Sequence, residues 1–480
     1  MAIKNFIIQK WRDFHKDVKG NVLILVGLAA IPMFGIAGLA LDYTSVLAAK
    51  TRLNASLDAA SVAAIAKTLA DKQAGISDDT AKADGAAQGK QAFLANAGSY
   101  GADVGNTLSV VVVRNGQDVT ATSSYTASVP TTFGKLFNIT SWNVSNSNSS
   151  TLKMPLYIDF YMLLDVSGSM GIPSTTDEQT RLAKINADDL NNYPTGCTFA
   201  CHFTTYKACQ NKQGQATTCQ GYIQSRAGGV VNSICQQPGT SSCIQLRLDA
   251  IGVAISKLLA TAQSTEAITG KSNQFRVGLY PFIVHTNANF QTLSTDLTGV
   301  VTTKANSLPS QLDTGNSTGV GSWDQTHMGS GGTNINNALN EMYQTVPTTH
   351  DDGSSATSTL PFVFLITDGA QDNQTMTNSN GSWSGSNHAT VLTQSYCTTL
   401  KTRATLAILY VPYSVIPNPN KNFAGDEDDY ANNNIPNIPP SLQSCASAGQ
   451  FYTANSPADI TAALQLMFNN ALQMAPRLVN

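Results

Sequence analysis

The feature that most constrains this chain is an uninterrupted apolar span near its N-terminus. Residues 22–41 read VLILVGLAAIPMFGIAGLAL and contain no charged side chain. A helix of this length is about 30 Å long, the thickness of the hydrocarbon layer of a membrane. The alternatives are a cleaved signal peptide, whose apolar segment is usually shorter, and a buried core helix, which seldom runs this long without charge. The span therefore predicts a retained transmembrane helix at residues 22–41.

The flanking charges predict the orientation of this helix. Five basic residues and two aspartates precede the span, and Asp42 follows it directly. Because basic residues stay on the cytoplasmic side, residues 1–21 are expected in the cytoplasm and everything after residue 42 outside it. The formal net charge of the whole chain is only -3, with 12% charged residues. That balance lacks the clustered basic surplus of a nucleic-acid-binding protein, so no nucleic-acid partner is expected.

The residues after the span carry an apolar helical stripe, which predicts that the membrane helix continues as a stalk helix to about residue 70. Residues 42–106 are thus interpreted as a stalk helix followed by a loop. The segment GNVLILVGLAAIPMFGIAGLAL and the following DYTSVLAAKTRLNASLDAASVAAIA resemble the N-terminal region of TadE/TadG-like pilus-assembly proteins of bacteria. The resemblance implies a membrane helix that runs into an alanine-rich helix.

A small β module is predicted at residues 107–153. Its apolar β-rich runs are residues 108–113, 119–121 and 125–129, and Asn115-Gly116 between the first two is a hairpin signal. The Asn/Ser-rich residues 143–150 are interpreted as a linker.

Residues 154–476 alternate short apolar runs with helical patterns, which predicts an α/β fold with a doubly wound, mostly parallel sheet. Residues 156–165 and 361–368 read as buried strands that each end in an aspartate. Ligands bind beyond the C-terminal ends of the strands in such sheets.

Three loops carry the chemistry: DVSGSM, SGGTNI and LITDG. Together they resemble the von Willebrand factor A family and its metal-ion-dependent adhesion site (MIDAS). The implied metal ligands are Asp165, Ser167, Ser169, Thr333 and Asp368. Hydroxyl and carboxylate oxygens suit Mg²⁺, or Mn²⁺ or Ca²⁺, rather than zinc or copper. The resemblance also implies that the ion leaves one position for a carboxylate of a partner protein. The alternative is that Ser169 and Thr333 cap helices and the aspartates occupy turns.

All eight cysteines follow the apolar span, which predicts disulfides in an oxidising compartment. Six of them fall in a predicted insertion at residues 172–244, with pairing left open: Cys197, Cys201, Cys209, Cys219, Cys235 and Cys243. Zinc binding is the alternative, but the insertion has no C-x2-C pair. The family resemblance further implies a Cys397–Cys445 disulfide, because both cysteines would precede successive strands at one edge of the sheet and TadG-like sequences place two cysteines similarly.

These resemblances imply a non-enzymatic, single-pass protein of the bacterial inner membrane, with its main domain in the periplasm. Its expected role is metal-dependent adhesion in the assembly or anchoring of a Flp-type (tight-adherence) pilus, with pilus or envelope components as partners. The alternatives are a minor pilin or surface adhesin that binds an external ligand, and an accessory A-domain subunit of an enzyme complex.

Overall fold

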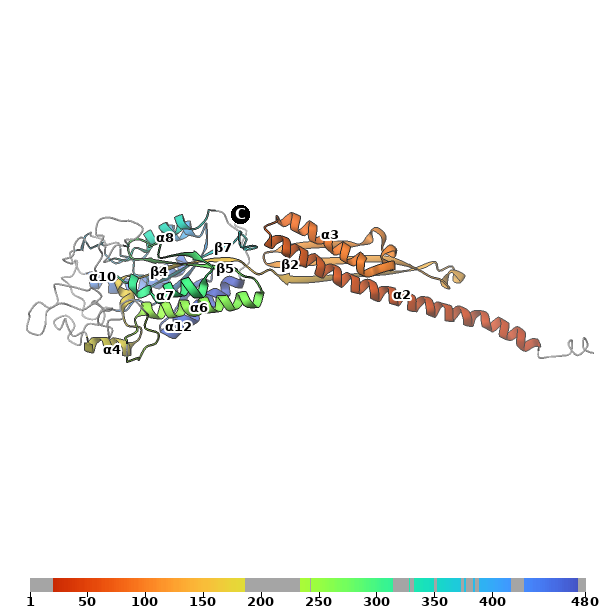
Figure 1. Ribbon diagram of the computed structural model, residues 1–480, viewed down its shortest axis with the longest axis horizontal. Helices are drawn as coiled ribbons and strands as arrows, with labels where there is room; N and C mark the ends of the chain where they lie inside the picture. The colour runs from red at the N-terminus through yellow and green to blue at the C-terminus, as the bar shows by residue number, and fades with distance from the viewer. Residues whose placement is uncertain are drawn as a thin grey trace, which may run out of the picture. The chain divides into compact units, whose positions relative to one another are not determined.

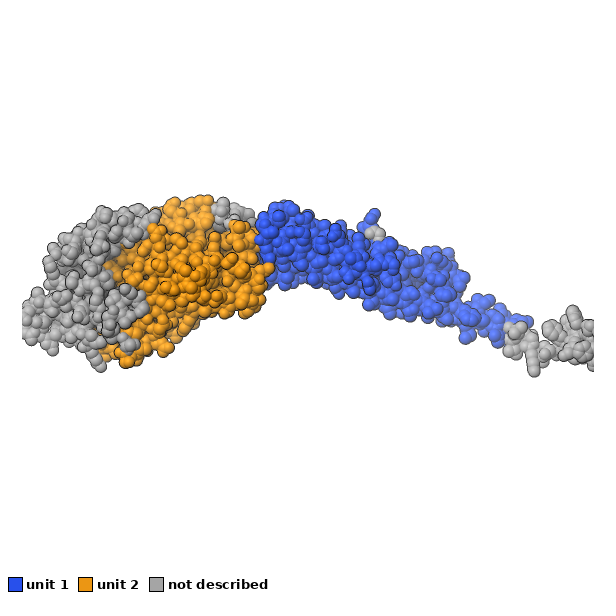
Figure 2. All heavy atoms as spheres, in the orientation of Figure 1, with its two compact units in different colours: residues 1–154 blue, residues 155–480 orange. Residues whose placement is uncertain are grey.

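A computed structural model describes residues 20–185, 234–241, 243–313, 328, 332–348, 352–372, 375–376, 383–384, 388–415 and 427–473. The chain divides into two compact units, residues 1–154 and 155–480 (Figure 2). Residues 1–19 of the predicted cytoplasmic segment lie outside the described residues, and so do residues 186–233 of the predicted insertion. Four cysteines of the insertion lie there too, namely Cys197, Cys201, Cys209 and Cys219.

The first unit begins with one long helix, α2, over Gly20–Gln73 (Figure 1). The apolar span and the stalk are therefore continuous, as predicted. Residues 24–73 of this helix are long and apolar enough to cross a membrane, with a mean hydropathy of 2.3 in the most apolar window. The side chains of the span are exposed in the isolated chain, for example Phe34 at 76%.

A second helix, α3, occupies Asp78–Ala97, where the sequence predicted a loop. The Ser77 side chain caps it by accepting the Thr80 amide. The sequence argument failed because this segment holds seven alanines but only two large apolar residues, Phe93 and Leu94, and so lacks a clear apolar helical stripe. Two glycines permit close packing on α2: a Cβ at Gly85 would lie 2.0 Å from the Thr68 hydroxyl oxygen, and one at Gly89 would lie 2.9 Å from the Ala60 carbonyl oxygen. Two short 3-10 turns follow, at Gly98–Asp103 and Gly105–Thr107.

A three-stranded antiparallel sheet completes the first unit, with strands β1 (Ser109–Asn115), β2 (Asp118–Pro130) and β3 (Ser141–Lys153). The predicted linker at residues 143–150 is wrong, since these residues lie within β3 and pair with β2 along its whole length. Most β3 side chains are small, polar and at least partly exposed. An edge strand of this kind lacks the apolar alternation by which strands are recognised.

The second unit is built on a six-stranded sheet in the order β11-β10-β7-β4-β5-β6. Its strands are β4 (Ile158–Asp165), β5 (Phe275–Phe282), β6 (Gln291–Ser294), β7 (Leu360–Thr367), β10 (Thr405–Tyr410) and β11 (Phe451–Thr453). All neighbouring pairs are parallel except β5–β6. The chain builds outward from β4 to β6 on one side and from β7 to β11 on the other. A separate two-stranded sheet pairs β8 (Thr375–Met376) with β9 (Trp383–Ser384).

Helices cover both faces of the six-stranded sheet (Figure 1). Alternate β4 side chains point to opposite faces: Phe160 and Met162 join one apolar cluster, and Tyr161 and Leu163 join the other. The first face packs against α6 (Arg247–Thr269) and α12 (Pro457–Gln473), and the second against α8 (Ile335–Thr345), α9 (Gln394–Leu400) and α11 (Ile438–Cys445). The shorter elements are η4 (Gly168–Gly171), α4 (Thr176–Ile185), η5 (Leu297–Val301), α7 (Thr302–Asn306), η6 (Leu308–Gln311), α10 (Glu427–Asn434) and η7 (Ile435–Asn437).

The described residues of the second unit contain two disulfides. Cys397 in α9 is bonded to Cys445 in α11, with their Cα atoms 5.2 Å apart. This is the pair that the family resemblance implied. Cys235 is bonded to Cys243, with a Cα separation of 6.0 Å, so these two cysteines of the predicted insertion pair with each other.

Candidate functional site

Asp165 lies at the C-terminal end of β4. Strands that follow in the chain are added beside β4 first on one side (β5, β6) and then, from β7 onward, on the other. All eight residues of β4 are buried, and Asp165 itself is 1% exposed. Its carboxylate accepts hydrogen bonds from the Ser167 amide at 3.0 Å and the Ser167 hydroxyl at 2.6 Å. Burial raises the pKa of Asp165, and these hydrogen bonds offset part of the rise.

The two serines share the turn that follows Asp165. Ser167 immediately precedes the 3-10 turn η4, and Ser169 lies within it. Their hydroxyl oxygens are 3.1 Å apart. Ser167 makes no side-chain cap hydrogen bond to η4. Its hydroxyl donates to the Asp165 carboxylate instead. The three polar side chains of DVSGS are thus gathered at one point.

Thr367 belongs to the same cluster, and the sequence argument missed it. Its hydroxyl donates to the second carboxylate oxygen of Asp165 at 2.6 Å and accepts the Gly369 amide at 2.9 Å. The available signal was a single hydroxyl residue at the end of an otherwise apolar strand, directly before Asp368. Thr367 therefore joins the ends of β4 and β7.

Asp368 follows β7 directly and has no exposed surface. Neither of its carboxylate oxygens has a hydrogen-bonding partner within the described residues. Burial, together with the negative charge of nearby Asp165, raises the pKa of Asp368 to about 7. The Ser169 hydroxyl and the Ala370 amide lie near the carboxylate without the geometry of a hydrogen bond, and together with the Arg247 guanidinium they lower this pKa in part. A buried carboxylate without a hydrogen-bonding partner is uncommon and demands an explanation.

Thr333 is held at the same edge of the sheet by its backbone. It pairs with Asp372, which follows β7, through amide–carbonyl distances of 2.6 and 2.8 Å. The next residue, Asn334, donates its amide to the carbonyl of Ile283 just after β5. Asn334, and not Thr333, caps helix α8. The alternative in which Thr333 serves as a helix cap is therefore wrong.

The donor set at this edge consists of oxygen atoms. Within the ranges that the structure describes, no group of three or more His, Cys, Asp or Glu side chains is placed to hold a metal ion. The edge offers two aspartates with the hydroxyls of Ser167 and Ser169 beside them. Such hard oxygen donors are those that Mg²⁺ accepts, and the two unpartnered oxygens of Asp368 fit a site for a cation.

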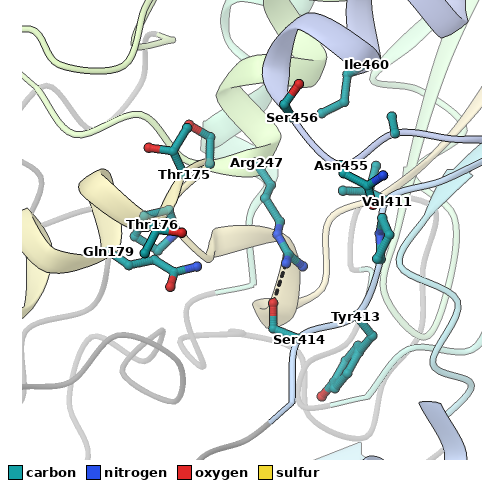
Figure 3. Close-up of a pocket in the computed structure, with 14 residues that line it drawn as sticks. Thr175, Thr176, Gln179, Arg247, Val411, Tyr413, Ser414, Asn455, Ser456 and Ile460 are labelled. Atoms are coloured by element: carbon teal, nitrogen blue, oxygen red, sulfur yellow. Dashed lines mark hydrogen bonds between the residues drawn. The ribbon is translucent and has the colours of Figure 1, made fainter. Parts of the chain in front are cut away.

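A cavity of about 410 Å³ adjoins this edge, at the ends of β10 and β11 and the start of α6 (Figure 3). Among the described residues that line it, Arg247 is the one charged residue, and its guanidinium donates to the Ser414 hydroxyl at 2.6 Å. The other lining residues include Thr175, Tyr413 and Asn455. Arg247 thus lines this cavity, and its positive charge also acts on Asp368.

Comparison with solved structures finds proteins of bacterial pili. The pilus adhesin SpaC from Lactobacillus rhamnosus GG, in its open conformation, aligns with a TM-score of 0.34 and 11% identity, over 76% of this chain and 34% of that chain. The PilB minor pilin from Streptococcus sanguinis aligns with a TM-score of 0.33 and 10% identity, over 76% of this chain and 78% of that chain.

The vWF domain of a type V pili tip protein from Porphyromonas gingivalis aligns with a TM-score of 0.31 and 11% identity, over 67% of this chain and 97% of that domain. TM-scores this low do not by themselves establish a shared fold. This chain also spans only about a third of the SpaC chain. None of the curated proteins matches the chain significantly.

The N-terminal helix has a clearer relationship. Residues 20–75 match the family model described as putative Flp pilus-assembly TadE/G-like. The match covers α2 and the two residues after it. The predicted TadE/TadG resemblance is therefore confirmed for this segment: residues 20–75 form a TadE/G-like Flp pilus-assembly domain.

Proposed function

We propose that this protein is a membrane-anchored component of a Flp-type (tight-adherence) pilus system that binds an acidic group of a partner protein through a metal ion. Its second unit is interpreted as a doubly wound von Willebrand factor A domain. The anchor is the N-terminal helix, with residues 1–21 in the cytoplasm and the main unit in the periplasm. The partner would be a pilus or envelope component, and no enzymatic activity is proposed.

The observation that carries this proposal is the buried carboxylate of Asp368. Both of its oxygens lack partners among the described residues, yet Asp165 and two serine hydroxyls lie beside it. Asp165, Ser167, Ser169, Thr333 and Asp368 would hold Mg²⁺, or Mn²⁺ or Ca²⁺ in its place. The ion would neutralise the two aspartates and attract a carboxylate of the partner.

The metal site is tested by calorimetry on the full-length protein in detergent after removal of divalent cations with EDTA. We expect one Mg²⁺ to bind per chain, and Asp165→Ala and Asp368→Asn to abolish that binding. The matched control is Asp459→Asn, because Asp459 is an exposed aspartate at the same edge of the sheet, in the first turn of α12. Absence of Mg²⁺ and Mn²⁺ binding in the unaltered protein would contradict the proposal.

The role in the pilus is tested in cells that produce each variant at equal levels. Asp165→Ala should remove surface pili, whereas Asp459→Asn should leave them unchanged. Normal pili in the Asp165→Ala cells would show that the site is not used in assembly.

The orientation is tested separately by reporter fusions after residue 60. Alkaline phosphatase should be active there and β-galactosidase inactive, because the fusion point lies beyond the apolar span on the exported side. The opposite pattern would place the main unit in the cytoplasm and exclude the proposed periplasmic site.

A further inference from the structure

The connection between β2 and β3 has an apolar tip. It forms a short 3-10 turn, η3 (Gly134–Phe137), in which Leu136 is 76% and Phe137 50% exposed. Phe133, just before the turn, is 39% exposed. Three large apolar side chains on one hairpin tip, with a single lysine (Lys135) between them, are unusual for a surface in contact with water.

This tip packs on the apolar span of α2. The Phe137 ring covers Gly35, where an added Cβ would lie 2.6 Å from the ring, and the Phe133 side chain covers Gly38 at an equally short distance. Both glycines are buried by these contacts, although the span side chains around them are exposed. Gly27, earlier in the span, has no atom within 4 Å of such a Cβ. The two glycines therefore form a slot for the hairpin tip.

Asp42 holds the tip in this position. Its carboxylate accepts the backbone amides of Thr132, Phe133 and Gly134 at 2.9, 2.9 and 2.6 Å. Asp42 is the first charged residue after the apolar span. The hairpin tip is thus attached to the helix at the level where the span ends, and its side chains extend back along the span.

The helix geometry gives the depth of the tip. At a rise of 1.5 Å per residue, Gly38 and Gly35 lie about 5 and 9 Å before Leu41, the last residue of the span. Interfacial segments insert their apolar faces to about this depth, between the headgroups and the acyl chains. Tyr43 and Trp142 pack edge to face with ring centroids 5.9 Å apart, just beyond the span. Tyrosine and tryptophan gather at this level in membrane proteins.

We propose that the β2–β3 tip, residues 131–140, inserts into the outer leaflet of the bilayer that the N-terminal helix spans. Phe133, Leu136 and Phe137 enter the acyl boundary, and Lys135 reaches anionic headgroups. This inference rests on the proposed anchoring by the helix. It gives the first unit a second attachment to the membrane, which restricts the tilt of the stalk above the bilayer.

The test is photo-crosslinking of the full chain in vesicles of phosphatidylcholine and phosphatidylglycerol. The photoreactive residue p-benzoylphenylalanine replaces Leu136 in one variant, Phe34 of the span in a second and Leu152 in a third. Leu152 is the matched control because it is a leucine of the same hairpin, 52% exposed. It lies about 35 Å along β3 from the tip end at Ser141. Lipid adducts are then measured by mass spectrometry.

The expected result is a lipid adduct at position 136 in an amount comparable with that at position 34. No lipid adduct is expected at position 152. An adduct at position 34 without one at 136 would overturn the insertion of the tip while leaving the anchoring intact. A crosslink from position 136 to a protein, including a second copy of this chain, would also overturn it. Loss of lipid adducts at both 34 and 136 would overturn the anchoring and the insertion together.

Discussion

Replacing Asp368 by asparagine should change the pH dependence of stability in a defined direction. In the metal-free protein, burial and Asp165 raise the pKa of Asp368 to about 7, so the folded state keeps a proton that the unfolded state releases near pH 4. Unfolding free energy is therefore lost as the pH rises from about 4 to about 7, and stays at the lower value above that. Asparagine has a similar shape and no charge, so the unfolding free energy of Asp368→Asn should not decrease over this pH range.

The size of the effect follows from the same shift. A rise of this pKa from its ordinary value of 3.8 to about 7 is equivalent to roughly 4 kcal/mol of unfolding free energy. The variant should therefore match the unaltered protein at pH 4 and exceed it by up to that amount at pH 8 in EDTA. Other carboxyl groups contribute equally to both proteins, so the difference between them isolates Asp368 and its coupling to Asp165.

The assay is urea unfolding of the full-length protein in detergent, read from hydrogen exchange of peptides from β4 and β7. Addition of Mg²⁺ at pH 8 should stabilise the unaltered protein and Asp459→Asn, but not Asp368→Asn, because an ion bound only by the folded state stabilises it. A stability difference that does not change with pH would refute the reasoning about burial. Equal stabilisation of Asp368→Asn by Mg²⁺ would refute the assignment of Asp368 to the metal site.

Three further substitutions probe the scaffold. Asp42→Ala should increase hydrogen exchange at the three hairpin amides that donate to the Asp42 carboxylate in the unaltered protein. Unchanged exchange would show that the carboxylate does not hold the tip. Arg276→Met should cost about 3 kcal/mol in urea unfolding, because Asp159 is 1% exposed and loses its paired guanidinium; a cost near zero would contradict this. The double change Cys397→Ser and Cys445→Ser should cost about 4 kcal/mol through the loop it releases, and equal stability of reduced and oxidised protein would argue against that role.

Much of the second unit could be predicted from the sequence, because its strands are short apolar runs with a polar residue at the end. Burial on both faces makes β4 and β7 mostly apolar, with Asp159 near the start of β4 as an exception within the strands, so Asp165 and Asp368 at their ends are easily recognised in the sequence. The position of Asp165 next to Asp368 then follows from the parallel pairing of two neighbouring strands. Thr367 could not be assigned in this way, because its role depends on a contact with a residue 202 positions away.

The first unit was harder to predict, because its elements are stabilised by contacts distant in sequence rather than by their own composition. Helix α3 depends on two glycines that let it approach α2, and glycine by itself disfavours a helix. Strand β3 depends on pairing with β2, and its polar residues resemble those of a linker. In the second unit, the pairing of Cys235 with Cys243 was also one of several that spacing alone allowed.

Local hydrophobicity and charge are enough to identify the apolar span, the basic flank before it and the order of the strands that end in aspartates. The folded chain was needed to find that two glycines of the span contact the rings of Phe133 and Phe137, and that the Asp42 carboxylate accepts backbone amides 90 to 92 positions later. Local patterns record which residues must be buried or exposed. They do not record which distant segment covers them, because that depends on packing between segments that meet only in the folded chain.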